Sequence, residues 1–246
     1  MIQLQAVAKP KRLTDDVIAK LTQKYKDDKT NVWKKKYITK SLLIMSADKC
    51  CFCETKLQEE SKYMEVEHFH PKKLYPDEVI SWDNLLPICK RCNVNKLDHD
   101  TVTDCIIHPV KDNPKEHLKL SDGGILRGTT PLGKRTVIIV KLNKNQNLDV
   151  IRDDIRTALG FKLIDLLDFT KIYCKTPSDY MKDKIIGNLK RIMQEGTREY
   201  EYSATAATVI LTNPDYTEIK RLFTTHNLWD DEFIQLERDV EYCALI

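Results

Sequence analysis

The sequence predicts an α+β fold in which a small metal-stabilised core is embedded in a mostly α-helical chain. Two Cys-x-x-Cys motifs, Cys50 with Cys53 and Cys89 with Cys92, delimit that core. Residues 50–100 lack a regular apolar period, as is typical where a metal and not an apolar core fixes the backbone. The chain on both sides of this region carries apolar residues at helical spacing.

Two helices are expected before the first motif. Thr14 can cap the first helix, which keeps apolar side chains on one face as far as Tyr25. Between Trp33 and Met45, apolar residues recur at steps of three and four, which predicts a second helix. Residues 1–48 are therefore the first of three predicted regions.

The second predicted region, residues 49–142, holds the core and a hairpin after it. Residues 63–69 predict a short strand, and residues 89–96 predict a helix. The Asp-Gly-Gly sequence at 122–124 indicates a turn, and the β-branched run at 136–142 predicts a strand.

The third predicted region, residues 143–246, is helical. Apolar residues from Leu148 to Leu167 predict one long helix, and Ser178 is placed to cap the next. Further helices are expected at residues 199–211, 214–223 and 230–242. We expect this subdomain to serve packing or partner docking.

Charge and composition narrow the class of protein only slightly. The chain has 246 residues and a formal net charge of +3, but residues 1–40 hold 11 Lys and Arg against four Asp and Glu. That basic surplus fits either a solvated helical surface or a face that follows phosphates. No apolar run is long enough to cross a membrane, and no signal peptide is evident, so a cytoplasmic, bacterial protein is expected. In a reducing compartment the eight cysteines favour metal binding over disulfides.

The four motif cysteines predict a structural zinc site. Each motif turns two thiolates toward one point, and four thiolates bind Zn²⁺ tetrahedrally. Cys51 is a competing ligand, since it would give a tighter spacing with Cys53. The 35 residues between Cys53 and Cys89 exceed the usual gap, so they form an insert between the two halves of the site.

Glu67 and His68 lie within this insert and bring acid–base chemistry. Histidine is suited to act as a general base because its pKa is near neutrality, and a carboxylate oxygen is a ligand that Mg²⁺ prefers. Adjacent residues of a plain strand point to opposite faces, so a bend is needed for both to reach one metal and its water. The alternative is a surface strand with a structural histidine. His70 is open to three interpretations: a substrate contact, a spare ligand or an ordinary surface residue.

Four stretches of the core, taken as a set, resemble the HNH endonuclease family in its zinc-containing form. They are Cys50-x-x-Cys53, Val66-Glu67-His68-Phe69-His70-Pro71-Lys72, Trp82-Asp83-Asn84-Leu85-Leu86-Pro87 and Cys89-x-x-Cys92-Asn93-x-x-Lys96. The resemblance implies a ββα-metal fold that hydrolyses nucleic-acid phosphodiesters with one divalent cation and a histidine base.

The resemblance also implies roles for individual residues. Glu67 and Asn93 would hold the catalytic cation, Mg²⁺ or another divalent ion, and His68 would be the general base. Asn84 would hold the loop and orient that histidine. The last position is Asn where the family name expects His, which keeps an oxygen ligand. Basic residues beside the motif are candidate contacts to substrate phosphates; they are Lys72, Arg91 and Lys96.

Further features extend from residue 30 to about 165: a helix before Lys49-Cys50, Val66-Glu67-His68-Phe69-x-Pro71-Lys72, Asp112-Asn113-Pro114-x-x-His117, an expected strand ending in Leu142-Asn143, and Arg152 on the next helix. Together they resemble the HNH subunit of the Septu anti-phage system, which is also found beside some retrons. In that family the nuclease works with an ABC-type ATPase. This chain has no Walker A loop, so ATP binding is expected of a partner. DNA is the expected substrate. Cleavage of RNA such as transfer RNA, or a non-catalytic zinc-bearing module that binds nucleic acid or protein, remain alternatives.

Overall fold

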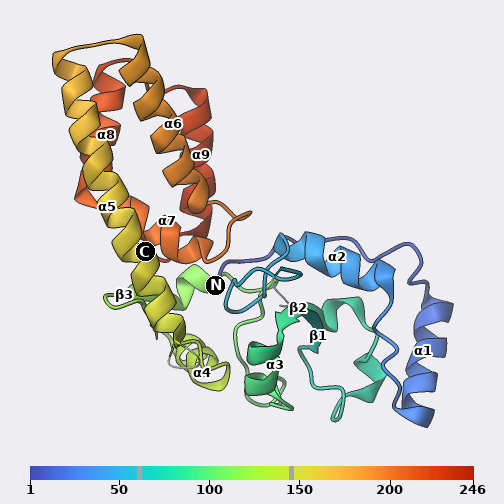
Figure 1. Ribbon diagram of the computed structural model, residues 1–246. Coiled ribbons are helices and arrows are strands. Elements are labelled where there is room, and N and C mark those ends of the chain that lie inside the picture. Colours follow the sequence, from blue (N-terminus) through green and yellow to red (C-terminus); the bar gives the residue numbers. More distant parts are fainter. Residues whose placement is uncertain (60–62, 144–146) are drawn as a thin grey trace. The chain divides into compact units, whose positions relative to one another are not determined.

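The computed structural model describes residues 1–59, 63–143 and 147–246, which form two compact units (Figure 1). The first unit comprises Met1, Gln3–His117 and Gly128–Leu142. The second comprises Ile2, Leu118–Arg127 and Asn143–Ile246. Most of the regular structure in the described residues is helical, and the strands form two small two-stranded sheets. The mixed α and β composition expected from the sequence is therefore confirmed.

The first unit begins with the two expected helices. Helix α1 spans Asp15–Asp28, and the Thr14 hydroxyl accepts a hydrogen bond from the Val17 amide at 3.3 Å, as an N-cap does. Helix α2 spans Lys36–Ser46. Its buried apolar side chains face the interior of the unit, which confirms the helix predicted from the period of three and four.

A hairpin and a short helix form the centre of the first unit. Strand β1, Met64–His68, pairs antiparallel with β2, Leu85–Cys89, so that Glu67 lies opposite Leu86 and His68 opposite Leu85. Helix α3, Lys90–Lys96, follows β2 without a loop. Two 3-10 turns, η1 (Pro76–Glu78) and η2 (Trp82–Asn84), lie between the strands.

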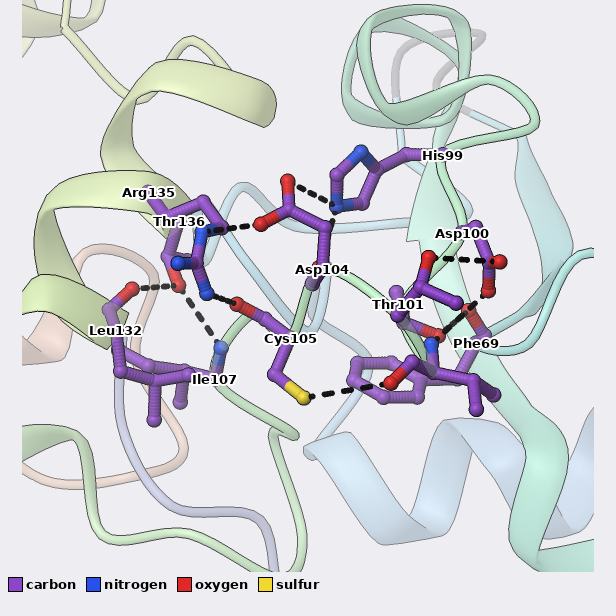
Figure 2. A network of polar contacts seen from close by, with 12 residues as sticks. Phe69, His99, Asp100, Thr101, Asp104, Cys105, Ile107, Leu132, Arg135 and Thr136 are labelled. Atoms are coloured by element: carbon purple, nitrogen blue, oxygen red, sulfur yellow. Dashed lines mark hydrogen bonds and ion pairs between the residues drawn. The ribbon is translucent and has the colours of Figure 1, made fainter.

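A polar network connects the segment after α3 to the rest of the unit (Figure 2). The Asp104 carboxylate lies 2.6 Å from Arg135 Nε and 3.5 Å from His99 Nε2. The Thr101 hydroxyl donates to the Phe69 carbonyl at 2.7 Å. The residue that follows β1 is thereby fixed from outside the sheet.

Residues 136–142 do not form the strand that the sequence predicts. Helix α4, Pro131–Ile139, covers most of them, and the remaining three residues are a turn. Pro131 stands at the first helical position, and the Thr130 hydroxyl caps the helix by accepting from the Gly133 amide at 3.1 Å. The Thr136 hydroxyl, fully buried, donates to the Leu132 carbonyl and accepts from the Ile107 amide, both at 2.8 Å. The helix start at Thr130 and Pro131 and the hydrogen bonds of the buried Thr136 hydroxyl outweigh the β propensity of the branched side chains.

The turn predicted at residues 122–124 is confirmed, but the two strands that it joins were not predicted from the sequence. Strand β3, Leu118–Ser121, and strand β4, Ile125–Gly128, form the second sheet. Gly123 and Gly124 have φ values of +68° and +67°, a conformation that glycine adopts without steric cost. The 3-10 turn η3, Pro114–Glu116, precedes β3.

The second unit contains the helices expected after residue 143. They are α5 (Leu148–Lys175), α6 (Asp179–Glu195), α7 (Ser203–Thr212), α8 (Pro214–Thr225) and α9 (Asp231–Cys243). Ser178 caps α6 as predicted, with its hydroxyl accepting from the Met181 amide at 3.3 Å. Among the described residues, no helix is both long and apolar enough to pass through a bilayer.

His108 is a buried histidine of the first unit whose ring must stay neutral. Its Nδ1 accepts from the amides of Val110 and Lys111, both at 3.2 Å, so a proton there would face two N–H groups. The ring packs 4.4 Å from that of Phe69, measured between centroids. Burial, with a smaller effect of the Lys111 charge, lowers the pKa of His108 to about 4.

Acidification should therefore destabilise the first unit. The unfolded histidine has a pKa of about 6.5, so the stabilisation is complete above that pH and is lost as the pH falls toward 4, by about 1.4 kcal/mol per pH unit. Urea unfolding at pH 7.0 and 5.5, followed by tryptophan fluorescence with Trp229→Phe as background, should show a shallower pH dependence in His108→Gln. Equal slopes in the two proteins would contradict this assignment.

Candidate active site

Four cysteines meet at one point of the first unit. The Sγ atoms of Cys50, Cys53, Cys89 and Cys92 lie within 4.8 Å of one another, and all four residues are buried. The Sγ atoms of Cys53 and Cys89 are 3.7 Å apart. Tetrahedral zinc with Zn–S bonds of about 2.3 Å requires sulfur atoms roughly 3.8 Å apart, so the cluster fits a Zn²⁺ ion.

The backbone around the cluster holds the first Cys-x-x-Cys segment against β2. The Cys51 amide donates to the Pro87 carbonyl at 2.9 Å, while the Cys51 thiol is not among the four clustered ones. Arg91, a predicted phosphate contact, instead donates from its guanidinium to Cys53 Sγ at 3.2 Å. A guanidinium beside thiolates compensates part of their negative charge.

One face of β1 is turned toward α3 and carries a buried ion pair. Glu67 is 3% exposed, and its Oε1 lies 2.6 Å from Nζ of Lys96, which is 1% exposed. Lys96 Nζ also donates to the His68 carbonyl at 3.3 Å. Burial raises the pKa of the Glu67 carboxyl, and the Lys96 charge opposes this effect. Lys96, predicted to contact substrate phosphate, thus lies inside the protein beside the predicted metal ligand.

A second pair lies next to the first, and sequence reasoning missed one of its members. Asn93 Nδ2 donates to Glu65 Oε2 at 2.5 Å. Glu65 and Glu67 share a face of β1 because side chains alternate along a strand, and Asn93 and Lys96 are one turn apart on α3. The spacing of two residues on the strand and of three on the helix can be read from the sequence, and it is the signal that could have identified Glu65. Carboxylate and amide oxygens on these neighbouring positions suit a hard divalent cation.

His68 lies on the other face of β1. The strand remains paired through His68 and Leu85, so the bend expected between Glu67 and His68 is absent, and the two side chains diverge. His68 is 4% exposed, its Nε2 is 3.0 Å from the Val79 carbonyl, and its ring centroid is 4.5 Å from that of Trp33.

The surroundings of His68 define its protonation. Burial lowers the pKa of His68 to about 3, and the charge of Lys72 acts in the same direction. The ring is therefore neutral at pH 7. Because the Val79 carbonyl can only accept, Nε2 carries the proton and Nδ1 keeps a lone pair. Lys72 Nζ lies 5.3 Å from the Trp33 ring centroid, which places this predicted phosphate contact on the His68 side.

Asn84 holds the loop after β1, as the resemblance implies, but through other partners than His68. Its side chain is buried; Oδ1 accepts from the His70 amide at 2.6 Å, and Nδ2 donates to the carbonyls of His70 and Glu78 at 3.1 and 3.2 Å. The Asn84 carbonyl accepts from the Phe69 amide at 2.9 Å. His70 Nδ1 in turn lies 2.6 Å from Glu78 Oε2.

Loss of one cluster cysteine should unfold the first unit. Cys89→Ser removes a zinc ligand, and zinc binding to such sites contributes folding free energy. We expect purified wild-type protein to carry about one zinc ion per chain by mass spectrometry of metals, and the variant to lose zinc and become protease-sensitive in residues 1–142. Cys105→Ser, an exposed cysteine of the same unit, is the matched control. A folded, zinc-free Cys89→Ser protein would exclude a structural zinc.

Comparison with known proteins assigns the family. The chain is 38% identical over 248 residues to the Septu protein PtuB of Bacillus thuringiensis, covering 100% of this chain and 96% of that protein. It is 28% identical over 212 residues to the Septu protein PtuB of Bacillus mycoides strain KBAB4, covering 68% of this chain and 71% of that protein. No protein-family model and no solved structure matches it. On the full-length identity, the chain belongs to the PtuB family of Septu proteins.

Proposed function

We propose that the chain is a metal-dependent HNH-type endonuclease that hydrolyses phosphodiester bonds of DNA. The observation that carries the proposal is the arrangement at the end of β1. The carboxylates of Glu65 and Glu67 lie on the α3 face, where the Asn93 amide contacts Glu65. His68, which follows Glu67 in the chain, is a neutral imidazole whose Nδ1 keeps a lone pair. A cation site beside a general base is what hydrolysis of a phosphodiester needs.

Glu67 and Asn93 would hold the catalytic cation, with Glu65 beside them. Oxygen donors of this kind suit Mg²⁺, which would act as a Lewis acid on the phosphate when bound. Lys96 supplies a positive charge to Glu67 in the metal-free protein and compensates its burial. A carboxylate shared between an ammonium and a cation is less available to the cation.

His68 would accept the proton of the attacking water at Nδ1. The hydrogen bond to the Val79 carbonyl fixes the ring and its tautomer, so the accepting nitrogen is defined before substrate binds. Lys72, half-buried beside Trp33, would contact a substrate phosphate. Breaking the bond from phosphorus to the 3′ oxygen leaves a 5′ phosphate and a 3′ hydroxyl.

We further propose that the nuclease is the effector of an anti-phage defence complex in the bacterial cytoplasm and works with an ABC-type ATPase. Membership of the PtuB family supports this assignment. The ATPase would supply nucleotide binding, since the chain has no Walker A loop. The helical second unit is the proposed docking region, because residues of the nuclease motif all belong to the first unit.

A non-catalytic zinc-bearing module is the second candidate function. The burial of Glu67 in an ion pair and of His68 under Trp33 favours it, because both side chains have structural partners. Such a module would keep the cysteine cluster and bind nucleic acid or protein without cleaving it.

His68→Ala should abolish cleavage while the chain stays folded, although with a lower free energy of unfolding because the ring is buried against Trp33. Removing a general base typically costs 10² to 10⁴ in rate, on the order of 3 to 5 kcal/mol of transition-state stabilisation. Nicking of plasmid DNA and cleavage of total RNA should be measured with Mg²⁺ and nucleotide, for the chain alone and copurified with its genomic neighbour. His226→Ala, in the second unit, is the matched control. Full activity of His68→Ala would exclude this base, and RNA-only cleavage would change the substrate class.

Lys96→Met should strengthen binding of a divalent cation. The substitution keeps the volume of the side chain and removes the ammonium that competes for Glu67. Calorimetric titration with Mn²⁺, in the absence of substrate, should give a lower Kd for the variant than for wild type, and Glu67→Gln should lose binding. Unchanged affinity in both variants would place the cation elsewhere.

A further inference from the structure

The buried amide of Asn84 uses its hydrogen bonds to fix two residues, His70 and Glu78. Both of its side-chain polar atoms are committed, two bonds to the backbone of His70 and one to that of Glu78. A buried polar group with all partners in place is rigid, because any displacement leaves an unpaired polar atom in the interior. The loop after β1 and the turn η1 are therefore held together at these two residues.

The side chains of the same two residues form an imidazole–carboxylate pair. His70 Nδ1 lies 2.6 Å from Glu78 Oε2, and the two side chains are 31% and 40% exposed. Among the described residues, His70 Nε2 has no hydrogen-bond partner. The carboxylate accepts from Nδ1 and so orients the ring. His70 is accordingly accessible to substrate, whereas His68 is nearly enclosed.

Aromatic rings hold the His70 ring in place. Its centroid lies 5.6 Å from that of Tyr75 and 5.7 Å from that of Phe69. Tyr75 is itself anchored, since its hydroxyl donates to Asp100 Oδ1 at 2.9 Å. A ring fixed by a carboxylate and two aromatic neighbours is preorganised in the way that a reacting group requires.

His68 is the last residue of β1, and His70 follows it after one residue, where the chain bends. Phe69, between them, is tied to the residue before β2, because its amide donates to the Asn84 carbonyl. Val79 and Glu78, adjacent in the chain, hold the two imidazoles. In an in-line displacement the attacking and leaving oxygens lie on opposite sides of phosphorus, so two separate imidazoles at the end of β1 can serve one oxygen each.

We propose that His70 is the general acid of the nuclease, positioned by Glu78 and Asn84. The inference rests on the proposed function. As water attacks phosphorus and its proton passes to His68, the bond to the 3′ oxygen breaks, and His70 Nε2 gives its proton to that oxygen. The balance is one water consumed, with a 5′ phosphate and a 3′ hydroxyl formed. Bulk water then returns His68 and His70 to their starting protonation.

The test replaces the leaving oxygen of DNA by sulfur. A 3′ thiolate leaves without protonation, so a general acid matters for the natural linkage and not for the 3′-phosphorothiolate linkage. We expect His70→Asn, in the complex as purified with its partner, to lose about 10² to 10⁴ in kcat on natural DNA and to cleave the sulfur substrate within a fewfold of wild type. Glu78→Gln should show the same pattern to a smaller degree. His68→Ala is the reference and should lose both activities.

Each outcome distinguishes the general acid from a structural role. Equal losses of His70→Asn on both substrates would overturn the proposal, as would wild-type rates on natural DNA. Urea unfolding of His70→Asn and wild type shows whether an equal loss comes from misfolding. His70→Gln provides a second variant. Its cleavage rate on natural DNA, divided by its rate on the 3′-phosphorothiolate substrate, must fall as in His70→Asn. A wild-type complex that cleaves neither substrate would overturn the proposed function itself, and this inference with it.

Discussion

The junction at Cys89 is the constraint on which the rest of the first unit depends. Cys89 is the last residue of β2 and the N-cap of α3, with its Sγ accepting from the Cys92 amide at 3.5 Å, and the same sulfur belongs to the four-cysteine cluster. A metal at that cluster would fix the direction in which α3 leaves the sheet. That direction sets Asn93 and Lys96 over β1, where they meet Glu65 and Glu67. The polar pairs at the candidate site thus follow from a thiolate site at the start of the helix.

The alternation of side chains along β1 separates two kinds of chemistry. The carboxylates of Glu65 and Glu67 face α3, whereas the His68 imidazole lies on the other face of the strand. The strand stays paired through His68, and the chain bends only after it, at residues 69 and 70, where Glu78 holds the His70 imidazole. In the proposed nuclease, the scissile phosphate must therefore lie past the end of the strand, where both faces are within reach.

Local geometry decided which features the sequence could predict. The cysteine spacing predicts the cluster because two residues in one turn point at the same ion, and Thr14 and Ser178 predict helix starts because a cap acts on amides two or three residues away. Residues 136–142 were predicted wrongly because strand propensity is weak beside a cap and a buried hydroxyl network. The ion pair of Lys96 was missed because sequence does not show burial. The partners of Asn84 were missed because they depend on how the turn η1 folds back on β1.

The buried ion pair of Glu67 and Lys96 implies different roles for the two proposed metals, the structural zinc and the catalytic cation. An isolated buried carboxylate is unfavourable, and breaking a buried pair by removing one partner typically costs about 3 to 5 kcal/mol. Because Lys96 already supplies the opposite charge, the fold does not require the catalytic cation. At the cysteine cluster, the cation that the described residues place on a sulfur is Arg91, beside Cys53, and four thiolates within 4.8 Å would need a dication between them. In the proposed nuclease, zinc would therefore act on folding, whereas the catalytic cation would enter a site that is already folded and charge-compensated.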